Sequence, residues 1–431
     1  MTTDGRFVVL GLAQARSTWF RAVAEWANSA SIPVEFVKCM SPAELRAHLG
    51  SGRAFSALLV DGALPALDRD LVDAAAEVGC AVVVVDDVRV TRDWRALGAA
   101  AVINPVFERK DLLDVLATHT ARIPRGDRVP GQVGAAVGPG ARGHVALVCG
   151  PGGTGVSTAA IALAQGLADD ARYARSVLLA DFARHAEQAM LHDARDVVPG
   201  VQELVDAHRT ARPPLEQVRS FTFDVEERGY HLLLGLRRAR SWSSIRPRAF
   251  DAAFDSTRRG WRAVVCDTDP DLEGEDEGGS IDVEERHVMS RTVAAHADVA
   301  FIVGLAGMKG IHSMVRVLTE LLDHGVPAPT VVPVVNRAPK AGRARAEITS
   351  AVGSLLRGRP ASGAMPSPIF LPERRVDEAL RDGVRLPTSL TAPLAGAFVA
   401  VVRSSATSNR TPTRDEPQLV APGSLGRWSD R

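Results

Sequence analysis

The chain has 431 residues, and at roughly 100 to 200 residues per domain this length predicts about two to four domains. Lysine plus arginine and aspartate plus glutamate each number 51, so the formal net charge is zero, which excludes a global electrostatic attraction to nucleic acid or acidic membranes. With 46% hydrophobic and 24% charged residues, the composition is that of a folded globular protein and excludes disorder along the whole chain.

No stretch of the sequence approaches the roughly 18 consecutive apolar residues of a membrane span. The first residues, MTTDGRFVVLGL, also lack the basic and then apolar layout of a signal peptide. We therefore expect a cytoplasmic protein. The sequence has four cysteines, each within or beside an apolar run, and we expect buried free thiols at Cys39, Cys80, Cys149 and Cys266.

The first 121 residues alternate short apolar runs with amphipathic stretches. The runs are FVVLGL, VEFVKC, FSALLVD, AVVVVDD and AAVIN. Runs that are apolar along their whole length are typical of a parallel sheet covered on both faces. Residues 1–121 are therefore predicted to form a doubly wound α/β domain. Residues 122–143 contain three prolines and six glycines and are predicted to be a linker.

Residues 144–403 repeat the same alternation and predict a second doubly wound α/β domain. Its apolar runs are HVALVC, SVLLAD, YHLLLGL, WRAVVCD, VAFIVG, TVVPVVN and SPIFL. Pro333 within TVVPVVN cannot donate to a sheet ladder, so this strand is expected to be bulged or shortened. The acidic, glycine-rich residues 267–287 predict a mobile loop, and the polar residues 404–431 predict a disordered tail.

The most informative segment is CGPGGTGVST, residues 149–158, which follows an apolar run and opens an alanine-rich stretch. It matches the phosphate-loop pattern G-x-x-x-x-G-K-[ST] except that Val156 stands where the lysine is expected. Glycines let backbone N–H groups surround an anion, and the positive end of a helix dipole points to the same place. Because a charge-assisted contact is lost with the lysine, we expect nucleotide binding to be weaker by about one to two orders of magnitude. The predicted nucleotide-binding residues of the loop are Gly150, Gly152, Gly153, Thr154, Gly155, Ser157 and Thr158.

The alternative is a glycine-rich turn that binds nothing. Read together with SVLLAD, GWRAVVCDTDP, VVNRAPK and SPIFLPERRVDEALRDG, however, the loop resembles that of the MinD/ParA superfamily of deviant-Walker ATPases. The resemblance spans most of residues 144–403. The family loop reads K-G-G-x-G-K-[ST]-T, and Pro151 and Val156 replace its two lysines.

This resemblance implies ATP or ADP with Mg²⁺ as the ligand, and it implies roles for individual residues. The implied Mg²⁺ ligands are Ser157, Asp181 and Asp267, and the implied adenine contacts are Asn336 and Arg337. The residues alone leave other roles open, because an acidic residue at a strand end often caps the next helix and an asparagine there is often a turn residue.

The resemblance also bears on hydrolysis. The second acidic motif of the family reads D-x-D, but Ala183 stands where its second aspartate would align the attacking water. Phosphoryl transfer depends on positioned charges, and three of them are missing, so we expect weak or no ATP hydrolysis and assign no catalytic residue. Arg184 or Arg237 is the candidate for a compensating positive charge.

The first domain resembles the receiver domain of response regulators. Asp61 ends the run FSALLVD at the phospho-acceptor position of that family. The acidic pair that would hold a metal after the first strand is absent, and Asn104 replaces the lysine before Pro105. Without a cation to neutralise an incoming phosphoryl group, Asp61 is expected to be a poor acceptor. We therefore expect a degenerate receiver that serves as a docking or dimerising module.

A receiver-like domain followed by a MinD-like domain resembles the CpaE/TadZ group, whose members act in Flp (Tad) pilus assembly, in polar placement of a secretion ATPase or, among actinobacterial relatives, in septum-site determination. The resemblance implies a localisation scaffold that forms a homodimer. Its implied partners are a secretion or pilus ATPase or cell-division proteins. It also implies recruitment to the inner face of the membrane at the pole or septum. The alternative is an active switch that ATP dimerises and hydrolysis releases.

Three further interpretations receive less weight: a DNA-binding surface, a membrane anchor and an iron–sulfur cluster. The arginines around Trp242 are expected to form a solvated, partner-facing loop rather than a DNA-binding surface; they are Arg237, Arg238, Arg240, Arg246 and Arg248. The stretch APLAGAFVAVV is expected to be core rather than a membrane anchor. Cys149 and Cys266 lie in predicted strands rather than loops, so no iron–sulfur cluster is expected.

Overall fold

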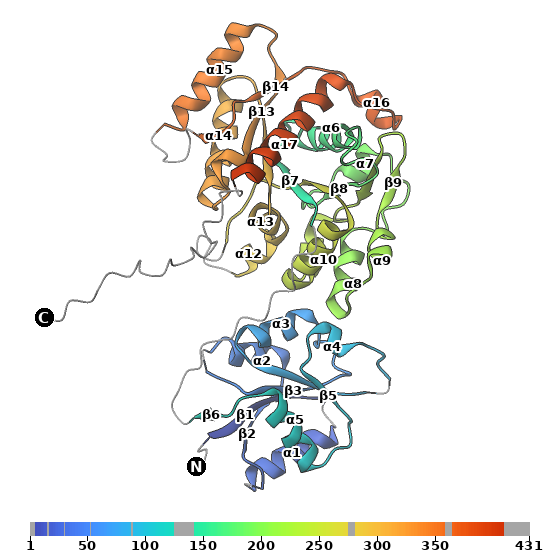
Figure 1. Ribbon diagram of the computed structural model, residues 1–431, viewed down its shortest axis with the longest axis vertical. Coiled ribbons are helices and arrows are strands. Elements are labelled where there is room, and N and C mark those ends of the chain that lie inside the picture. The colour runs from blue at the N-terminus through green and yellow to red at the C-terminus, as the bar shows by residue number, and fades with distance from the viewer. Residues whose placement is uncertain are drawn as a thin grey trace, which may run out of the picture.

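A computed structural model of the protein describes residues 5–14, 17–29, 31–51, 53–87, 89–124, 142–274, 281–357 and 364–408. These residues form two α/β units, residues 5–124 and 142–408, each built on its own sheet (Figure 1). The expectation of two doubly wound parallel-sheet domains is therefore confirmed. Most of the predicted linker and nearly all of the predicted tail lie outside the described residues.

The first unit contains a parallel sheet with the strand order β2-β1-β3-β4-β5, and β6 joins it antiparallel to β1. One face is covered by α2, α3 and α4, and the other by α1 and α5. The strands are β1 (Gly5–Leu12), β2 (Val34–Cys39), β3 (Ala57–Asp61), β4 (Ala81–Val85), β5 (Ala101–Ile103) and β6 (Ile123–Pro124). The helices are α1 (Thr18–Asn28), α2 (Pro42–Leu49), α3 (Arg69–Glu77), α4 (Trp94–Leu97) and α5 (Arg109–His119).

The second unit contains a sheet with the strand order β14-β13-β12-β7-β11-β8-β10-β9, parallel except for β9. The order reverses on either side of β7, which places the loop after β7 at the topological switch point where ligands bind in open α/β sheets. The strands are β7 (His144–Cys149), β8 (Val177–Asp181), β9 (Phe223–Val225), β10 (Tyr230–Leu233), β11 (Ala263–Asp267), β12 (Val299–Leu305), β13 (Val331–Ala338) and β14 (Ile369–Pro372).

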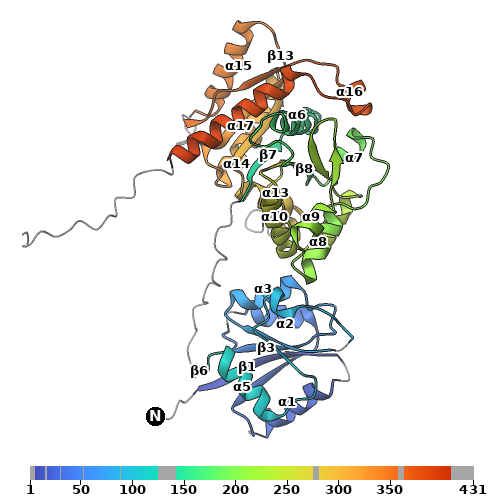
Figure 2. The ribbon, with the colours of Figure 1, turned by 45° about the vertical axis from the view of Figure 1, so that its right-hand side comes forward.

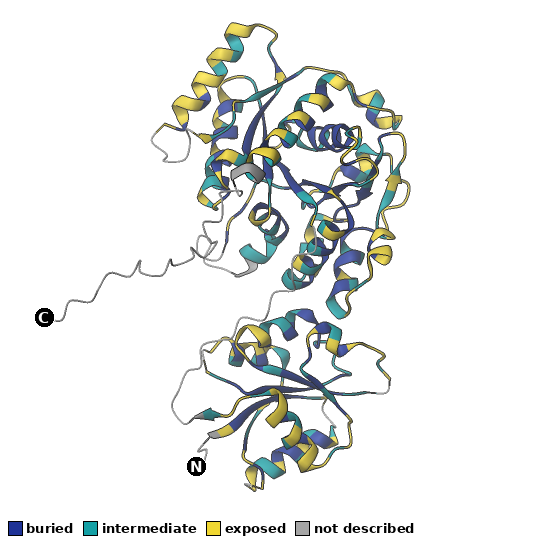
Figure 3. Ribbon diagram, in the orientation of Figure 1, coloured by how far each residue is buried: buried dark blue, intermediate teal, exposed yellow. Residues whose placement is uncertain are grey.

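Helices cover both faces of this sheet (Figure 2). One face holds α6 (Val156–Ala168), α16 (Asp377–Arg381) and α17 (Thr388–Ser408), and the other holds α8 (Val201–Thr210), α10 (Pro247–Gly260), α13 (Val288–Ala295) and α14 (Met308–Asp323). The remaining helices are α7 (Gln188–Leu191), α9 (Leu215–Arg219), α12 (Ile281–Arg286) and α15 (Gly342–Leu355), with the 3-10 turns Ala239–Ser244 and Ala328–Thr330. The central strands of both sheets are buried (Figure 3) because their side chains are apolar on both sides.

The structure differs from the sequence-based expectations in four segments. Pro333 lies within a full-length β13, opposite Ile302 of β12, and the register shift expected of a bulge occurs further on, between Val335 and Ala338. Part of the expected acidic loop forms α12, while residues 275–280 lie outside the described residues. Helix α17 continues past Arg403 to Ser408, so the chain is helical where the tail was expected to begin.

The fourth difference is at the start of the expected linker, where β6 pairs with β1.

The four cysteines are buried and free, as expected. The APLAGAFVAVV stretch lies in α17 and packs into the core with Leu394, Phe398 and Val401. Among the described residues, no helix combines the length and the apolar character that crossing a bilayer requires.

The two units are joined through the first turn of α3, which lies against α8 and α10 (Figure 1). Arg69 is buried, and its guanidinium donates to the backbone oxygens of His208 at 2.8 Å and Ala211 at 2.9 Å, which lie at the carboxyl end of α8. Asp70 accepts from the backbone N–H of Arg248 at 3.2 Å, in the first turn of α10. A cation at a helix C-terminus and an anion at a helix N-terminus both complement the helix dipole. One helix of the first unit therefore completes the ends of two helices of the second.

Two ion pairs extend this contact between the units. Arg248 forms a bidentate pair with Glu77, with one N–O distance of 2.6 Å, and Arg209 contacts the buried Asp68 at 3.4 Å. Arg248 is one of the arginines expected to face a partner, and here it faces the first unit of the same chain. Asp68 also accepts from the N–H of Leu71, so it caps α3 while it meets Arg209.

A buried histidine at this interface makes stability depend on pH. His208 is 3% exposed, its Nδ1 lies 2.8 Å from the oxygen of Leu204, and burial lowers its pKa from 6.5 to about 4. Between these two pKa values the unfolded chain therefore binds a proton that the folded chain does not. The free energy of unfolding accordingly decreases as the pH falls through this window. We expect His208 alone to cost about 2 kcal/mol of unfolding free energy between about pH 7 and about pH 5.

The measurement is urea unfolding of the protein and of His208→Gln at both pH values. Partly buried carboxyl groups with raised pKa, such as Asp70 and Asp73, shift stability in the opposite direction, but both proteins contain them and their effects cancel in the comparison. We expect the variant to lose less stability on acidification than the parent protein. Equal losses would contradict the neutral, buried state of His208.

Candidate phosphate-binding site

The glycine-rich loop lies between β7, which ends at Cys149, and α6, which begins at Val156. A Cβ atom on Gly150 would lie 2.2 Å from the oxygen of Val303, so only glycine lets the loop start this close to β12. Gly155 is the N-cap of α6 with φ +88°, a left-handed conformation that favours glycine. These two glycines shape the turn that leads the chain from the strand into the helix.

The middle of the loop is open. Ideal Cβ atoms on Gly152 and Gly153 would have no neighbour within 4 Å, and both residues are exposed. Helix α6 has no side-chain cap, so the N–H groups of its first turn have no side-chain acceptor at the cap. The hydroxyl of Thr154 donates to the oxygen of Pro151 at 2.7 Å and closes the loop on itself. Open space, a helix start without a side-chain cap and the positive helix end together fit an anion such as phosphate.

Asn336 lies against this loop, at the end of β13. Its Nδ2 donates to the oxygen of Thr154 at 2.8 Å, and a Cβ atom on Gly155 would lie 2.5 Å from that nitrogen. Arg337 is exposed, has φ +50°, and donates its N–H to the Oδ1 of Asn336 at 2.9 Å. The structure therefore brings Asn336 to the loop as a support for the backbone, while contact of either residue with adenine stays a prediction.

The two aspartates of the predicted Mg²⁺ site lie side by side, because Asp181 at the end of β8 is in register with Asp267 at the end of β11. Both are buried. Burial, together with the charge of Asp267, raises the pKa of Asp181, and burial raises the pKa of Asp267 to about 6. Asp181 accepts from the N–H groups of Ala183 at 3.3 Å and Gln188 at 2.9 Å, so it holds the turn into α7 as a cap does.

Gln188 is the residue of this site that sequence reasoning missed. Its Nε2 donates to Oδ2 of Asp267 at 2.8 Å and to the backbone oxygen of Ser157 at 3.2 Å. The side chain of Ser157 also hydrogen-bonds Asp267. The three residues predicted as Mg²⁺ ligands thus lie together, and Gln188 hydrogen-bonds to each of them. The one signal in the sequence was a polar residue seven positions after Asp181, too general a feature to single out.

These contacts decide which ligands the site fits. A divalent cation such as Mg²⁺ needs oxygen ligands turned towards it. Here an N–H donor of Gln188 and the hydroxyl of Ser157 are both turned towards Asp267, the carboxylate that would bind the cation. Among the described residues, no group of three His, Cys, Asp or Glu side chains is arranged to hold a metal. The loop therefore fits a phosphate, and the predicted Mg²⁺ position does not fit the cation as these side chains stand.

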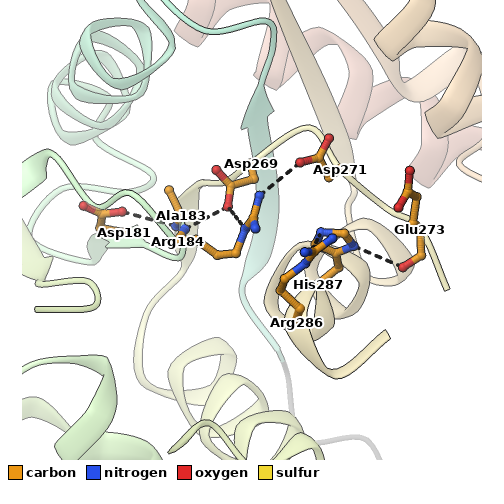
Figure 4. A network of polar contacts seen from close by, with 8 residues as sticks. All are labelled: Asp181, Ala183, Arg184, Asp269, Asp271, Glu273, Arg286 and His287. Carbon is orange, nitrogen blue, oxygen red and sulfur yellow. Dashed lines mark hydrogen bonds and ion pairs between the residues drawn. The ribbon is translucent and has the colours of Figure 1, made fainter. Parts of the chain in front are cut away.

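The arginines proposed to compensate for the missing lysines are engaged elsewhere, and Figure 4 shows the contacts of Arg184. The N–H and Nε of Arg184 donate to Asp269 at 2.8 and 3.1 Å, and its Nη2 donates to Asp271 at 3.1 Å. Arg237 pairs with Glu203. Both cations are thus neutralised by carboxylates on their own chain.

Figure 4 also shows that the segment after β11 contacts the start of α13. His287, at the start of α13, lies with its Nδ1 3.2 Å from the oxygen of Glu273, and Arg286 donates to the other ring nitrogen at 3.3 Å. Arg291 of α13 donates to the oxygen of Leu272. The described part of this acidic segment is therefore pinned to α13 on one side and to Arg184 on the other.

The predicted phospho-acceptor of the first unit ends β3. Asp61 accepts from the N–H of Ala63 at 3.1 Å and from the N–H of Gln14 at 3.5 Å. The nearby Asp87 forms an ion pair with Arg89 at 2.5 Å, which lowers the pKa of Asp87 to about 2. These contacts do not test the resemblance to a receiver, and a docking role for this unit stays our prediction.

Comparison with known proteins gives structural neighbours only. No family model matches the chain, and no curated protein matches its sequence. The chain is similar in structure to a ParA family ATPase from Chlorobium tepidum TLS, with 15% identity over 60% of this chain and 99% of the other and a TM-score of 0.48. It is also similar to the septum site-determining protein MinD complexed with Mg-ADP from Pyrococcus horikoshii OT3 (16% identity, 62% and 97% covered, TM-score 0.41) and to a complex of a Cyanothece McdA variant with ATP (15%, 62% and 98%, 0.43). At these identities and TM-scores, the function of this chain has to be inferred from its own residues.

Proposed function

We propose that the chain is a localisation scaffold of the MinD/ParA type that binds a nucleotide phosphate weakly and hydrolyses ATP little or not at all. The observation that carries this proposal is the contact of the Gln188 amide with Ser157 and Asp267, two of the three residues predicted to bind Mg²⁺. The open backbone of Gly152 and Gly153 supports binding of the phosphate itself. Binding without efficient hydrolysis is what this combination favours.

The loss of hydrolysis follows from the charges. Phosphoryl transfer needs cations on the transferred group and a positioned water. Pro151 and Val156 supply no cation, the methyl group of Ala183 cannot align a water, and Arg184 is bound to Asp269 and Asp271. Electrostatic stabilisation is usually the largest part of such a rate enhancement, so its loss leaves little catalysis.

As a scaffold, the protein would act through its surfaces. We infer a homodimer of the CpaE/TadZ type in which the first unit serves as a docking module. Its partners would be a pilus or secretion ATPase, or cell-division proteins at the septum, on the inner face of the membrane. The second candidate function, an ATP-driven dimerisation switch, is supported by the same open loop.

Titration calorimetry with ATP tests phosphate binding. We expect weak binding that Gly152→Asp abolishes, because a carboxylate in the loop repels the phosphate, and the open space around Gly152 accepts the new side chain. The matched control is Gly353→Asp, on the exposed surface of α15, where a Cβ atom also meets nothing within 4 Å. An absence of heat at millimolar ATP would overturn nucleotide binding and leave a scaffold without this ligand.

Phosphate release and sedimentation, measured on the same three proteins, distinguish scaffold from switch. We expect no release above background and the same oligomeric state with and without ATP. Phosphate release that Gly152→Asp removes and Gly353→Asp keeps, together with dimers that form only with ATP, would support the switch instead.

A further inference from the structure

Burial and hydrogen bonds hold Gln188 in place. It is fully buried, with 0% exposure, although it belongs to the short helix α7. Its N–H donates to Asp181, and its backbone oxygen is 2.8 Å from Nδ1 of His192. Nε2 of His192 in turn lies 2.7 Å from the hydroxyl of Tyr230. The main chain of Gln188 is thus held from two sides, so its amide is presented to Asp267 in one position.

Two buried polar atoms, one in this site and one on the residue that follows Asp267, have no partner among the described residues. They are Oε1 of Gln188 and the hydroxyl of Thr268, the residue after Asp267. Both side chains are more than nine-tenths buried. Buried polar atoms without a partner are costly, and they point to a ligand or water that completes the site. A hydroxyl can donate to a phosphate oxygen, and an amide oxygen can accept from a water or a protonated phosphate oxygen.

We propose that the amide of Gln188 stands in the place of the divalent cation, so that the loop binds the phosphate of a nucleotide without Mg²⁺. This inference rests on the proposed function, because it assumes that the loop binds a phosphate. The side-chain Nε2 of Gln188 donates to Oδ2 of Asp267, and the side chain of Ser157 is hydrogen-bonded to the same carboxylate. A cation would have to compete with the Gln188 amide for this carboxylate.

The test compares ATP affinity in EDTA and in Mg²⁺, by titration calorimetry of the full chain. For the parent protein we expect the same affinity within about threefold, because no cation takes part. In Gln188→Met, which keeps the volume and removes the amide, Asp267 becomes free to bind a cation. We therefore expect Mg²⁺ to strengthen ATP binding to this variant by about tenfold or more.

The matched control is Gln165→Met. Gln165 is also buried, and its amide makes two hydrogen bonds, both to the backbone of Leu386. Its replacement removes a buried amide without touching the loop, so ATP binding should stay independent of Mg²⁺.

A second readout needs no nucleotide. Gln188→Glu would place a third carboxylate beside Asp181 and Asp267, and Mn²⁺ should then raise the Tm of this variant by a few degrees while leaving the Tm of the parent protein unchanged. A rise of the parent Tm with Mn²⁺, or parent ATP binding that EDTA abolishes, would overturn the role of Gln188 while keeping phosphate binding. An absence of ATP binding with and without Mg²⁺ would overturn the proposed function as well.

Discussion

Replacing Arg69 with alanine is expected to lower the free energy of unfolding by about 3 kcal/mol and to loosen the two units from each other. Arg69 is 5% exposed and donates to two backbone oxygens at the end of α8. Its removal would leave the backbone oxygen of the buried His208 without this donor and would take a positive charge away from Asp70 and Asp73. Burial lowers the pKa of Arg69, but an arginine stays charged across the ordinary pH range.

Urea unfolding gives the change in stability, and small-angle scattering gives the radius of gyration, which should increase if the units separate. The control is Arg95→Ala, an exposed arginine on α4 of the same unit, which should change neither quantity. An Arg69→Ala protein with the parent stability and the parent scattering curve would show that α3 does not join the units in solution.

Replacing Val156 with lysine is expected to strengthen ATP binding by about 10- to 100-fold. Val156 is the first residue of α6 and is half-buried beside the loop, so a lysine there supplies the charge that the phosphate pattern calls for. Hydrolysis should stay at background, because Ala183 and the engaged Arg184 are unchanged. Affinity and turnover would therefore respond separately.

Titration calorimetry at low and high salt measures this effect. Val156→Met extends the side chain without a charge and serves as the control. We expect only the lysine variant to bind more tightly, and we expect its advantage to shrink at high salt, because salt screens the new charge. An equal gain in both variants would mean that packing, not charge, limits binding.

The fold could be predicted because its signals are local. Runs such as HVALVC and AVVVVDD are apolar throughout, and this pattern alone indicates strands buried on both faces. The loop from Gly150 to Gly155 was equally clear, because its glycines follow such a run directly. The resemblance to the MinD/ParA superfamily implied that Asp181 and Asp267 lie near one another, and they do so because the neighbouring parallel strands β8 and β11 end at the same edge of the sheet.

The rest of the site depends on contacts that the local pattern does not encode. Gln188 reaches Asp267 only because the chain folds back across the ends of β8 and β11 after Asp181. Arg248 was expected to be solvated, since nothing near it in the sequence indicates that Glu77 lies opposite. The helix α12 was missed for a different reason, because its acidic and glycine-rich surroundings are typical of loops.

The caps that α3 provides make the two sheets thermodynamically dependent on each other. Asp70 and Arg69 complete the ends of α10 and α8, and these helices pack directly into the core of the second unit. Melting of the first unit would therefore leave uncapped helix ends in the second. In a differential scanning calorimeter the chain should accordingly absorb heat in a single peak, with the calorimetric and van't Hoff enthalpies equal for the whole molecule.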